Sequence, residues 1–482
     1  MKILLVQPAR WTSPLSSAMV MEPLGMEACA AMVIEHHDVR ILDMRFEMDF
    51  DGVVREFEPD VIGATVITAD FHTSTDLFRR AKEINPEIVT IAGGPHAILV
   101  PEDFKGYHTD IAVATEGEEV FQDVICYLDG GKDLTEVPGL VLFRGDQSTR
   151  TPRRQLMPRI GELPLPARHL TAKYRPHYFR GEWKPLAVSY TERGCAFSCT
   201  FCSTWLLGGA AYRTRGVDTV IRDLQSIEEP FVFMAEDDSM YNREYSNALA
   251  DAIIESGIKK KYQFYSRSDH IVANPDLYAK WKKAGMGLLL IGMEMATDED
   301  LTKVHKENTI ENNQKAAKFL DSIGAEAISY FMVDPLTFTA KEFDRLTEYI
   351  VDLGLSHPIF FIMTPLPGTV LYTQQKQHIV NPNYDFFDFY HCVFQTKIPL
   401  GEFYQRFINL YKDCYGIRND EVSNQSAFSG DVIRVLVQRL EKEYDSYIRG
   451  GLGINDQVSV DIPPPVVAKD LFPEKYKLQW SR

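Results

Sequence analysis

The chain has 482 residues, of which 45% are hydrophobic, 25% charged and 11% aromatic. This composition excludes the collagen-like, disordered and coiled-coil classes, and the length allows more than one buried core. The formal net charge is −17, from 51 basic and 68 acidic side chains. Such a balance argues against broad nucleic-acid binding, because that binding needs basic side chains to neutralise phosphates.

The N-terminal segment MKILLVQPAR predicts a buried strand rather than a targeting signal, since its apolar run is short. No stretch of the sequence approaches the ~20 apolar residues of a membrane-spanning helix. The seven cysteines are an odd number in a long chain, which does not suggest a disulfide framework. We therefore expect a cytoplasmic protein without a transmembrane segment.

The first part of the chain, residues 1–135, alternates short apolar runs with helical patterns. This alternation predicts a doubly wound, Rossmann-like α/β domain, with a parallel sheet and helices on both faces. The expected strands are residues 3–7, 39–42, 61–68, 88–92 and 111–114, and the expected helices start near residue 22 and cover 71–84 and 118–128.

Polar and glycine residues follow these strands, where ligands of such sheets bind. The glycine pair would let the backbone approach a bulky ligand. No G-x-G-x-x-G follows the first strand, which argues against a nicotinamide or flavin. Each position is also compatible with an ordinary turn between strand and helix. The candidate ligand-binding residues are Pro8, Ala9, Thr65, Gly93, Gly94, His96, Glu116 and Gly117.

Residues 136–185 are rich in Pro and Arg and are interpreted as a linker. A second series of strands and helices follows in residues 186–375 and predicts a partial (β/α)6 TIM barrel, with its active site at the C-terminal ends of the strands. Its expected strands are residues 187–190, 231–235, 262–266, 287–292, 327–333 and 359–363. Residues 376–482 are interpreted as a mainly helical, aromatic-rich extension, with helices over 400–415 and 431–447 before a Pro-rich tail.

Three cysteines, Cys195, Cys199 and Cys202, follow the first barrel strand within eight residues. Cysteine thiolates hold iron–sulfur clusters, usually four to a cluster. Three thiolates leave one iron open to bind a small molecule. A structural zinc site would need four ligands, and the nearest further thiols are the distant Cys126 and Cys392. We favour an iron–sulfur cluster over zinc or incidental cysteines.

This segment resembles the signature of the radical S-adenosylmethionine (SAM) superfamily, C-x-x-x-C-x-aromatic-C, with Gly194 before it and Phe201 as the aromatic residue. The resemblance implies that Cys195, Cys199 and Cys202 bind a [4Fe–4S] cluster whose fourth iron chelates SAM, and that Phe201 lies beside the adenine. Reduction of the cluster would then cleave SAM to a 5′-deoxyadenosyl radical, which abstracts hydrogen from the substrate.

The ends of the next barrel strands agree with this resemblance. It implies that Glu236 and Asp238 face the SAM amine and that Glu294 holds the ribose hydroxyls. Ser266 and Arg267 end the third strand, and an arginine can hold a carboxylate through two parallel hydrogen bonds. Each acid is alternatively a helix N-cap or a solvated loop residue. We found no acid–base pair or triad, and the catalytic residues stay unassigned.

A doubly wound domain before such a barrel resembles the cobalamin-binding members of the superfamily. The matching segments are Gly93-Gly94-Pro95-His96, Glu116-Gly117-Glu118 and residues 163–168. The cobalt-ligating motif D-x-H-x-x-G is missing, and Pro8-Ala9-Arg10-Trp11 stands in its place. The resemblance implies cobalamin bound base-off without a histidine ligand, or else a domain that has lost cobalamin. His96 is expected to form hydrogen bonds rather than to bind cobalt.

The segments 331–335, 363–369 and 384–388, with Pro399-Leu400 and Phe403-Tyr404, resemble the hopanoid C-3 methylase group. This resemblance implies methylation of an unactivated carbon, of a polycyclic lipid for example, through methylcobalamin. Two alternatives stay open: a radical cyclase, oxidase or rearrangement enzyme that transfers no methyl, and a non-catalytic regulator that binds cluster and cobalamin. The implied partners are a small-molecule or lipid substrate and a reductase, flavodoxin or ferredoxin as electron donor. A lipid substrate would place the protein at the periphery of the inner membrane.

Overall fold

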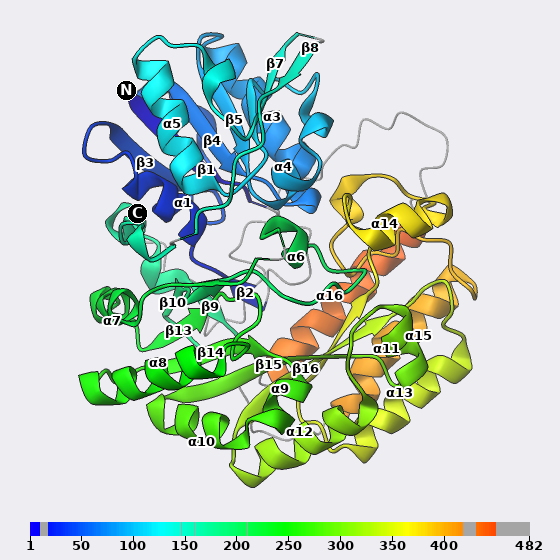
Figure 1. The fold of residues 1–482 in the computed structure, drawn as a ribbon. Coiled ribbons are helices and arrows are strands. Elements are labelled where there is room, and N and C mark those ends of the chain that lie inside the picture. Colours follow the sequence, from blue (N-terminus) through cyan, green and yellow to red (C-terminus); the bar gives the residue numbers. More distant parts are fainter. Residues whose placement is uncertain (10–17, 146, 159, 210, 418–429, 450–482) are drawn as a thin grey trace.

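Two large sheets organise the chain in the computed structural model, which describes residues 1–9, 18–145, 147–158, 160–209, 211–417 and 430–449 (Figure 1). We call the first sheet with its helices the first domain and the second sheet with its helices the barrel. The first sheet has the order β3 (Asp38–Asp43), β1 (Lys2–Gln7), β4 (Val61–Thr65), β5 (Val89–Gly93), β6 (Ile111–Val113), β7 (Leu140–Arg144) and β8 (Gln147–Arg150).

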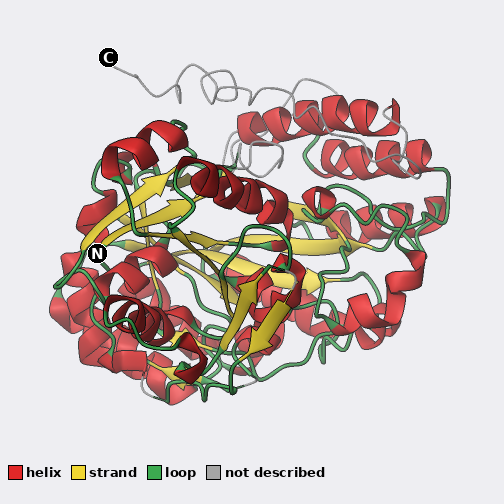
Figure 2. Cartoon of the chain, turned by 90° about the horizontal axis from the view of Figure 1, so that it is seen from above, coloured by secondary structure: helices red, strands yellow, loops and turns green. Residues whose placement is uncertain are grey.

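The two faces of the first sheet are covered by different helices, as Figure 2 shows from above. Ile3 and Leu5 of β1 pack towards α1 (Leu24–Ala31) and α5 (Gly117–Asp129). The alternate residues Leu4 and Val6 pack towards α2 (Phe50–Phe57) and α3 (Phe71–Ile84). Because both faces are buried, the strand reads as a continuous apolar run rather than as an alternating one. The predicted doubly wound arrangement is confirmed.

The structure differs from the prediction at one edge of this sheet. Strands β7 and β8 form a hairpin that pairs antiparallel with β6, so the sheet is mixed and extends to Arg150, within the segment interpreted as linker. All four side chains of β8 are exposed. An exposed edge strand has no apolar face, and the sequence therefore gives no alternating pattern from which to predict it.

The second sheet consists of six parallel strands in chain order, which is the predicted partial barrel. The strands are β10 (Leu186–Ser189), β13 (Phe231–Met234), β14 (Lys261–Ser266), β15 (Met286–Glu294), β16 (Glu326–Val333) and β17 (Pro358–Ile362). The helices outside them are α7 (Val217–Ser226), α8 (Arg243–Ser256), α10 (Pro275–Ala284), α12 (Ile310–Ser322) and α13 (Ala340–Asp352).

The C-terminal extension is helical in its described part and covers the β17 side of the barrel. Helices α15 (Leu400–Cys414) and α16 (Gly430–Arg449) pack against each other. The Tyr411 hydroxyl donates to the carbonyl oxygen of Phe360 in β17 at 2.8 Å, and the rings of Tyr404 and Tyr444 stack at 3.8 Å. These rings are fully buried, so this part of the aromatic-rich stretch forms core. The Pro-rich tail after Arg449 and the segment Arg10-Trp11 lie outside the described residues.

Shorter elements connect these layers. They are β2 (Met19–Val20), β9 (Phe179–Arg180), β11 (Glu192–Arg193), β12 (Arg213–Thr214), α4 (Pro95–Leu99), α6 (Thr204–Leu207), α9 (Ser268–Ala273), α11 (Asp298–Lys303) and α14 (Val370–Gln375). In Figure 1, α6 lies between the first domain above and the barrel below. Of the helices in the described part of the chain, none has the length and apolar character that crossing a bilayer requires.

The linker takes part in the contact between the domains. Arg168, which is buried, donates from Nη1 to Oδ1 of Asp223 in α7 at 2.5 Å and from Nη2 to the carbonyl oxygen of Val188 in β10 at 2.8 Å. Its Nε lies 3.2 Å from Oε1 of Glu22, just before α1. A single buried guanidinium therefore joins the first domain, the linker and the barrel.

Candidate active site

The three cysteines lie in a loop at the carboxyl end of β10, which we call the cluster loop (residues 194–209). Cys199 is buried, and Cys195 and Cys202 are half-buried. Burial raises the pKa of Cys195 to about 12, and the nearby charge of Asp238 contributes to this rise. Burial also raises the pKa of Cys199 to about 11, although the positive charge of Lys306 opposes the rise. Since thiolates are the ligands of a cluster, its assembly here must release these protons.

The backbone around the cysteines is fixed at several points. Gly194 has φ 92°, and a Cβ there would lie 1.9 Å from the carbonyl oxygen of Ala211, so only glycine fits. Its N–H donates to Oδ2 of Asp237 at 2.6 Å. Further along, the Thr200 N–H donates to the carbonyl oxygen of Val304 at 3.0 Å. The loop is thereby attached to segments that follow two different barrel strands.

In the described part of the chain, no three His, Cys, Asp or Glu side chains converge as ligands of a single metal ion would. In a cubane each thiolate binds its own iron atom, so the ligands of a cluster need not converge on one point. The assignment of Cys195, Cys199 and Cys202 as cluster ligands therefore stays a prediction.

Asp238, in the turn after β13, carries the clearest sign of an absent polar partner. It is 3% exposed, and neither of its carboxylate oxygens accepts a hydrogen bond from the described residues. The nearest cation-forming group is His270, whose Nδ1 lies 3.4 Å from Oδ1. Burial raises the pKa of Asp238 to about 7, although Arg267 and Lys306 oppose the rise. Buried polar groups are normally satisfied, so this carboxylate is suited to accept hydrogen bonds from a bound ligand.

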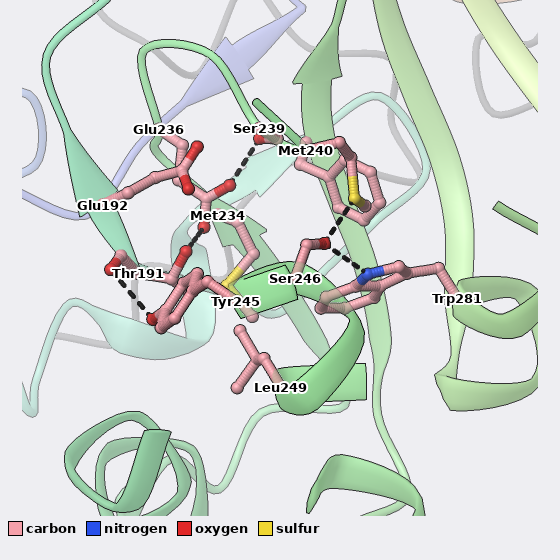
Figure 3. A pocket seen from close by; sticks show the side chains of 11 residues that line it. Thr191, Glu192, Met234, Glu236, Ser239, Met240, Tyr245, Ser246, Leu249 and Trp281 are labelled. Atoms are coloured by element: carbon pink, nitrogen blue, oxygen red, sulfur yellow. Dashed lines mark hydrogen bonds between the residues drawn. The ribbon is translucent and has the colours of Figure 1, made fainter. Parts of the chain in front are cut away.

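Glu236 is satisfied by the protein itself. Its carboxylate accepts hydrogen bonds from the hydroxyls of Thr191 and Ser239 (Figure 3), and burial raises its pKa. The cavity beside it has a volume of about 10 Å³, which is room for one water at most. Of the two predicted amine-binding acids, Asp238 is the one with unpaired oxygens.

Glu192, in β11, was not identified from the sequence. It lines the same cavity in Figure 3 and is buried. Its Oε2 accepts from the Tyr212 hydroxyl, while Oε1 has no partner among the described residues. Burial and the nearby charge of Glu236 raise its pKa well above the usual value. No motif marks this residue, because it comes before the cysteine signature and enters the site only through the β11–β12 pairing.

Arg267 is bound to its own surroundings. Its guanidinium lies 3.5 Å from the ring centroid of Phe197 in the cluster loop. Its Nη2 donates to the carbonyl oxygen of Lys306 at 2.9 Å, and its Nε donates to Oδ1 of Asp269 at 3.0 Å. Ser266, before it, shares a hydrogen bond of 2.6 Å with the Tyr278 hydroxyl. Arg267 thus contacts the cluster loop, and its role as a clamp on the carboxylate of a ligand stays a prediction.

Glu294 at the end of β15 forms a buried ion pair that the sequence did not predict. Its Oε1 accepts from Lys306 Nζ at 2.7 Å, and its backbone has φ 66°. A Cβ on Gly292 would lie 2.3 Å from that oxygen, so glycine makes room for the pair. Lys306 comes 12 residues later in the sequence, a spacing that no helix or strand period marks. Phe201 packs nearby on an apolar cluster that includes Met295 and Met332.

The expected ligand edge of the first sheet is built differently. Gly94 has φ 88°, and a Cβ there would lie 2.7 Å from Thr65 Oγ1, so the turn itself requires glycine. A Cβ on Gly93 would meet nothing closer than 3.9 Å. Ile67, just after β4, is 46% exposed. An uncrowded glycine beside an exposed apolar side chain fits a large, partly apolar ligand such as a corrin.

His96 is part of the core of the first domain. It is 1% exposed, its Nδ1 lies 3.2 Å from Thr68 Oγ1, and its Nε2 lies 3.4 Å from Oδ2 of Asp103. The contact of His96 with cobalamin, and its expected absence from the cobalt ligands, stay predictions. Pro8 is buried, and Ala9 packs against the same core.

Glu116, a predicted cobalamin residue, contacts the barrel. Both of its carboxylate oxygens accept from the guanidinium of Arg213 in β12, at 2.6 and 2.7 Å. Gly117 lies against Cys29, whose Sγ would be 3.3 Å from an added Cβ. The structure therefore gives these two positions packing and ion-pair roles, and their contact with cobalamin stays a prediction.

Comparison with known proteins follows the two parts of the fold. The family profile described as B12 binding domain matches residues 15–125, and that of the Radical SAM superfamily matches residues 190–350. The hopanoid C-3 methylase of Methylococcus capsulatus is 29% identical, over 99% of this chain and 91% of the relative. The anaerobic magnesium-protoporphyrin IX monomethyl ester cyclase of Rubrivivax gelatinosus is 25% identical, over 74% and 66% respectively. The solved structure of the cobalamin-dependent radical enzyme OxsB, with aqua-cobalamin and SAM bound, is 14% identical and superposes with a TM-score of 0.70, over 94% of this chain and 73% of that one.

Proposed function

We propose that this chain is a C-methyltransferase of the cobalamin-dependent branch of the radical SAM superfamily, and that it methylates an unactivated carbon of an apolar, polycyclic substrate such as a hopanoid. The cluster with SAM supplies the hydrogen-abstracting radical and cobalamin supplies the methyl group. The chain has to hold these groups, orient them and keep water from them.

The residues of the barrel mouth are suited to the first of these tasks. Cys195, Cys199 and Cys202 would hold the cluster. The unpaired carboxylate of Asp238 would accept hydrogen bonds from the SAM amine, and charge-assisted hydrogen bonds of this kind are short and strong. Glu294, fixed by Lys306, would accept from the ribose hydroxyls.

Three barrel strands, β14, β16 and β17, each place one aromatic ring outside the barrel and one inside. The outer rings contact helices. The ring centroids of Phe264 and Trp281 in α10 are 5.3 Å apart, those of Phe331 and Tyr349 in α13 are 6.2 Å apart, and those of Phe360 and Tyr411 in α15 are 4.9 Å apart. Successive side chains of a strand point to opposite faces. The residues next to the outer rings therefore face the barrel interior, and they are Tyr265, Tyr330 and Phe361.

These inner rings are the observation that carries the substrate proposal. The ring centroids of Tyr330 and Phe361 are 5.5 Å apart, and those of Phe361 and Phe389 are 6.0 Å apart. Tyr265 and Phe389 remain 37% and 38% exposed, although Tyr265 belongs to a central strand of the sheet. Aromatic faces favour stacked or edge-on contacts with other ring systems, so these side chains are suited to an apolar polycycle.

A second candidate is a radical cyclase that transfers no methyl group. It is favoured by the 25% identity with the magnesium-protoporphyrin cyclase of R. gelatinosus, whose name also denotes action on a polycyclic molecule. The aromatic interior suits either reaction, and only the products distinguish them.

Product analysis under anaerobic conditions tests both. The reconstituted enzyme is given hydroxocobalamin, a reductant, SAM and a lipid extract, and 5′-deoxyadenosine and S-adenosylhomocysteine are quantified by mass spectrometry. The proposed reaction requires both products to rise together with a lipid that has gained a methyl group. Deoxyadenosine alone would favour the cyclase. Tyr265→Ala should lower the yield of methylated lipid, whereas Tyr127→Ala on the outer face of the first domain should not.

The electron donor and the location belong to the same proposal. A flavodoxin, ferredoxin or reductase would reduce the cluster. Ala196 and Ser198 of the cluster loop are exposed, so the electron donor can reach the cluster from this side. A hopanoid substrate would bring the enzyme to the inner membrane as a peripheral protein. Reduction by flavodoxin, and sedimentation with vesicles that contain the substrate, would test these two points.

A further inference from the structure

Two arginines on either side of the cluster loop form ion pairs with the first domain. We propose that these interdomain ion pairs, Arg193–Glu118 and Arg213–Glu116, position the cluster loop relative to the cobalamin-binding edge. The inference rests on the proposed function, because it concerns the distance between the two cofactors of that reaction.

The arginines belong to the short ribbon that carries the cluster loop. Strands β11 and β12 pair antiparallel, with Arg193 directly opposite Arg213, and the loop with the three cysteines lies between them in the chain. Like charges directly opposite in a ribbon destabilise it. The ribbon therefore depends on the two glutamates to neutralise this pair.

The glutamates come from the start of α5 in the first domain, where Glu116 is the residue before the helix and Glu118 lies in its first turn. Both carboxylate oxygens of Glu118 accept from Arg193, the longer bond joining Nη1 and Oε2 at 3.3 Å. Glu116 accepts from Arg213 through both oxygens. Such two-bond pairs fix direction as well as distance. This turn lies at the carboxyl edge of the first sheet, where ligands of doubly wound domains bind.

The pairs are sheltered from solvent. Glu118 is buried, and although burial would raise its pKa, the guanidinium of Arg193 holds it below the usual value. Arg193 also lies over the ring of Tyr190, 4.5 Å from its centroid, and Arg213 donates to the carbonyl oxygen of Met157 in the linker at 3.0 Å. Removing one member leaves a buried charge without a partner, which is strongly destabilising locally.

Positioning of this kind should affect the two SAM reactions differently. Deoxyadenosine is formed at the cluster alone, so it depends on the barrel. S-adenosylhomocysteine is formed when the methyl group passes to the cobalamin of the other domain, so it depends on the distance between the domains. A misplacement of about 1 Å can lower the rate of a step by about 100-fold.

The test compares Glu118→Gln with Glu119→Gln in the reconstituted holoenzyme. Glu119 is the next residue of α5 but pairs with Arg154 at 3.2 Å and is more exposed, so it is a matched control. With a reductant and no added substrate, Glu118→Gln should keep its iron and cobalamin content and its deoxyadenosine rate within about twofold. It should form S-adenosylhomocysteine, of which at most one per cobalamin is made because nothing removes the methyl group, at least tenfold more slowly. Arg193→Lys keeps the charge but cannot form the two parallel hydrogen bonds of a guanidinium. Its rate of S-adenosylhomocysteine formation should lie between those of the wild type and Glu118→Gln. If Glu118→Gln does not fold, Arg193→Lys is compared with the wild type in its place.

Two readouts do not depend on turnover. The relaxation of the cob(II)alamin EPR signal by the reduced cluster should change in Glu118→Gln. In cobalamin-free protein, amide hydrogen exchange of residues 192–194 and 213–215 should rise in Glu118→Gln and not in Glu119→Gln. Unchanged exchange and relaxation, or an equal fall of both SAM products, would overturn the positioning role. A wild-type enzyme that forms no S-adenosylhomocysteine would refute the methyl transfer instead, while hydrogen exchange would still decide on the ion pairs.

Discussion

The carboxyl edge of each sheet lies on the side of the other domain, but the acidic side chains at the two edges differ in whether they have partners. At the barrel edge, Asp238 is buried with both oxygens unpaired. At the edge of the first sheet, both carboxylate oxygens of Glu116 accept from Arg213. His96 there is buried and contacts Thr68 through Nδ1, while its Nε2 has no hydrogen-bond partner among the described residues. The carboxylate at the barrel edge is thus left unpaired, whereas the carboxylate at the edge of the first sheet is paired.

This difference matches the ligands that the two edges receive. SAM is small and cationic, so a buried carboxylate left without a partner can select it. Cobalamin is large and partly apolar, so it can be held by shape, by backbone at Gly93 and by exposed side chains such as Ile67. A buried carboxylate without a hydrogen-bond donor marks the first kind of site.

The largest effect is expected for the cluster ligands. Cys199→Ala should abolish cluster binding and deoxyadenosine formation, because two thiolates cannot replace three. Iron content and the EPR spectrum of the reduced protein measure this loss. Cys126→Ala, which removes an exposed cysteine of the first domain, is the control and should behave as wild type. A cluster retained in Cys199→Ala would contradict the assignment of the whole loop.

A large but partial effect is expected for the unpaired acid. Asp238→Asn should weaken SAM binding by about 10- to 100-fold, since charged hydrogen bonds contribute roughly 1.5–3 kcal/mol. Titration calorimetry on the reconstituted protein would measure the dissociation constant. Glu244→Gln, on the exposed start of α8, should leave it unchanged. An unaltered affinity in Asp238→Asn would remove the contrast between the two edges.

The same substitution should stabilise the protein without cofactors, in a way that depends on pH. The pKa of Asp238 is raised by burial to about 7, so between its unfolded value and pH 7 the unfolded state binds fewer protons, and stability falls as the pH rises. Asp238→Asn does not lose stability in this way as the pH rises. Its advantage over wild type should grow by about 1.4 kcal/mol between pH 5 and pH 6, measured by denaturant unfolding of the apoprotein. An advantage that is constant with pH would show that the carboxylate is solvated.

The smallest effect is expected at the first sheet. His96→Gln should leave the EPR spectrum of bound cob(II)alamin unchanged and cost about 1 kcal/mol of stability, the usual contribution of one hydrogen bond. Nitrogen splitting in the wild-type spectrum that disappears in the variant would identify His96 as a cobalt ligand after all.

Much of this protein could be read from its sequence, for reasons that are local. Strands such as β1 and helices such as α3 follow from apolar periodicity, and the cysteine spacing indicates the cluster chemistry. The exposed strand β8 could not be predicted, because it has no buried face. Lys306 and Glu192 were missed because their partners are remote or unmarked in the sequence.

The sequence by itself determined the order of the domains, the strands and the chemistry of the cysteine loop, since these depend on residue type and on spacing along the chain. Only the tertiary structure decided which polar groups are satisfied. Glu116 and Glu118 form ion pairs with the arginines of β12 and β11, whereas the Asp238 carboxylate accepts no hydrogen bond from the described residues. Whether a charged side chain pairs within the protein or is left to bind a ligand depends on its burial and on its neighbours from other elements. The spacing of residues in a sequence gives information on neither of these.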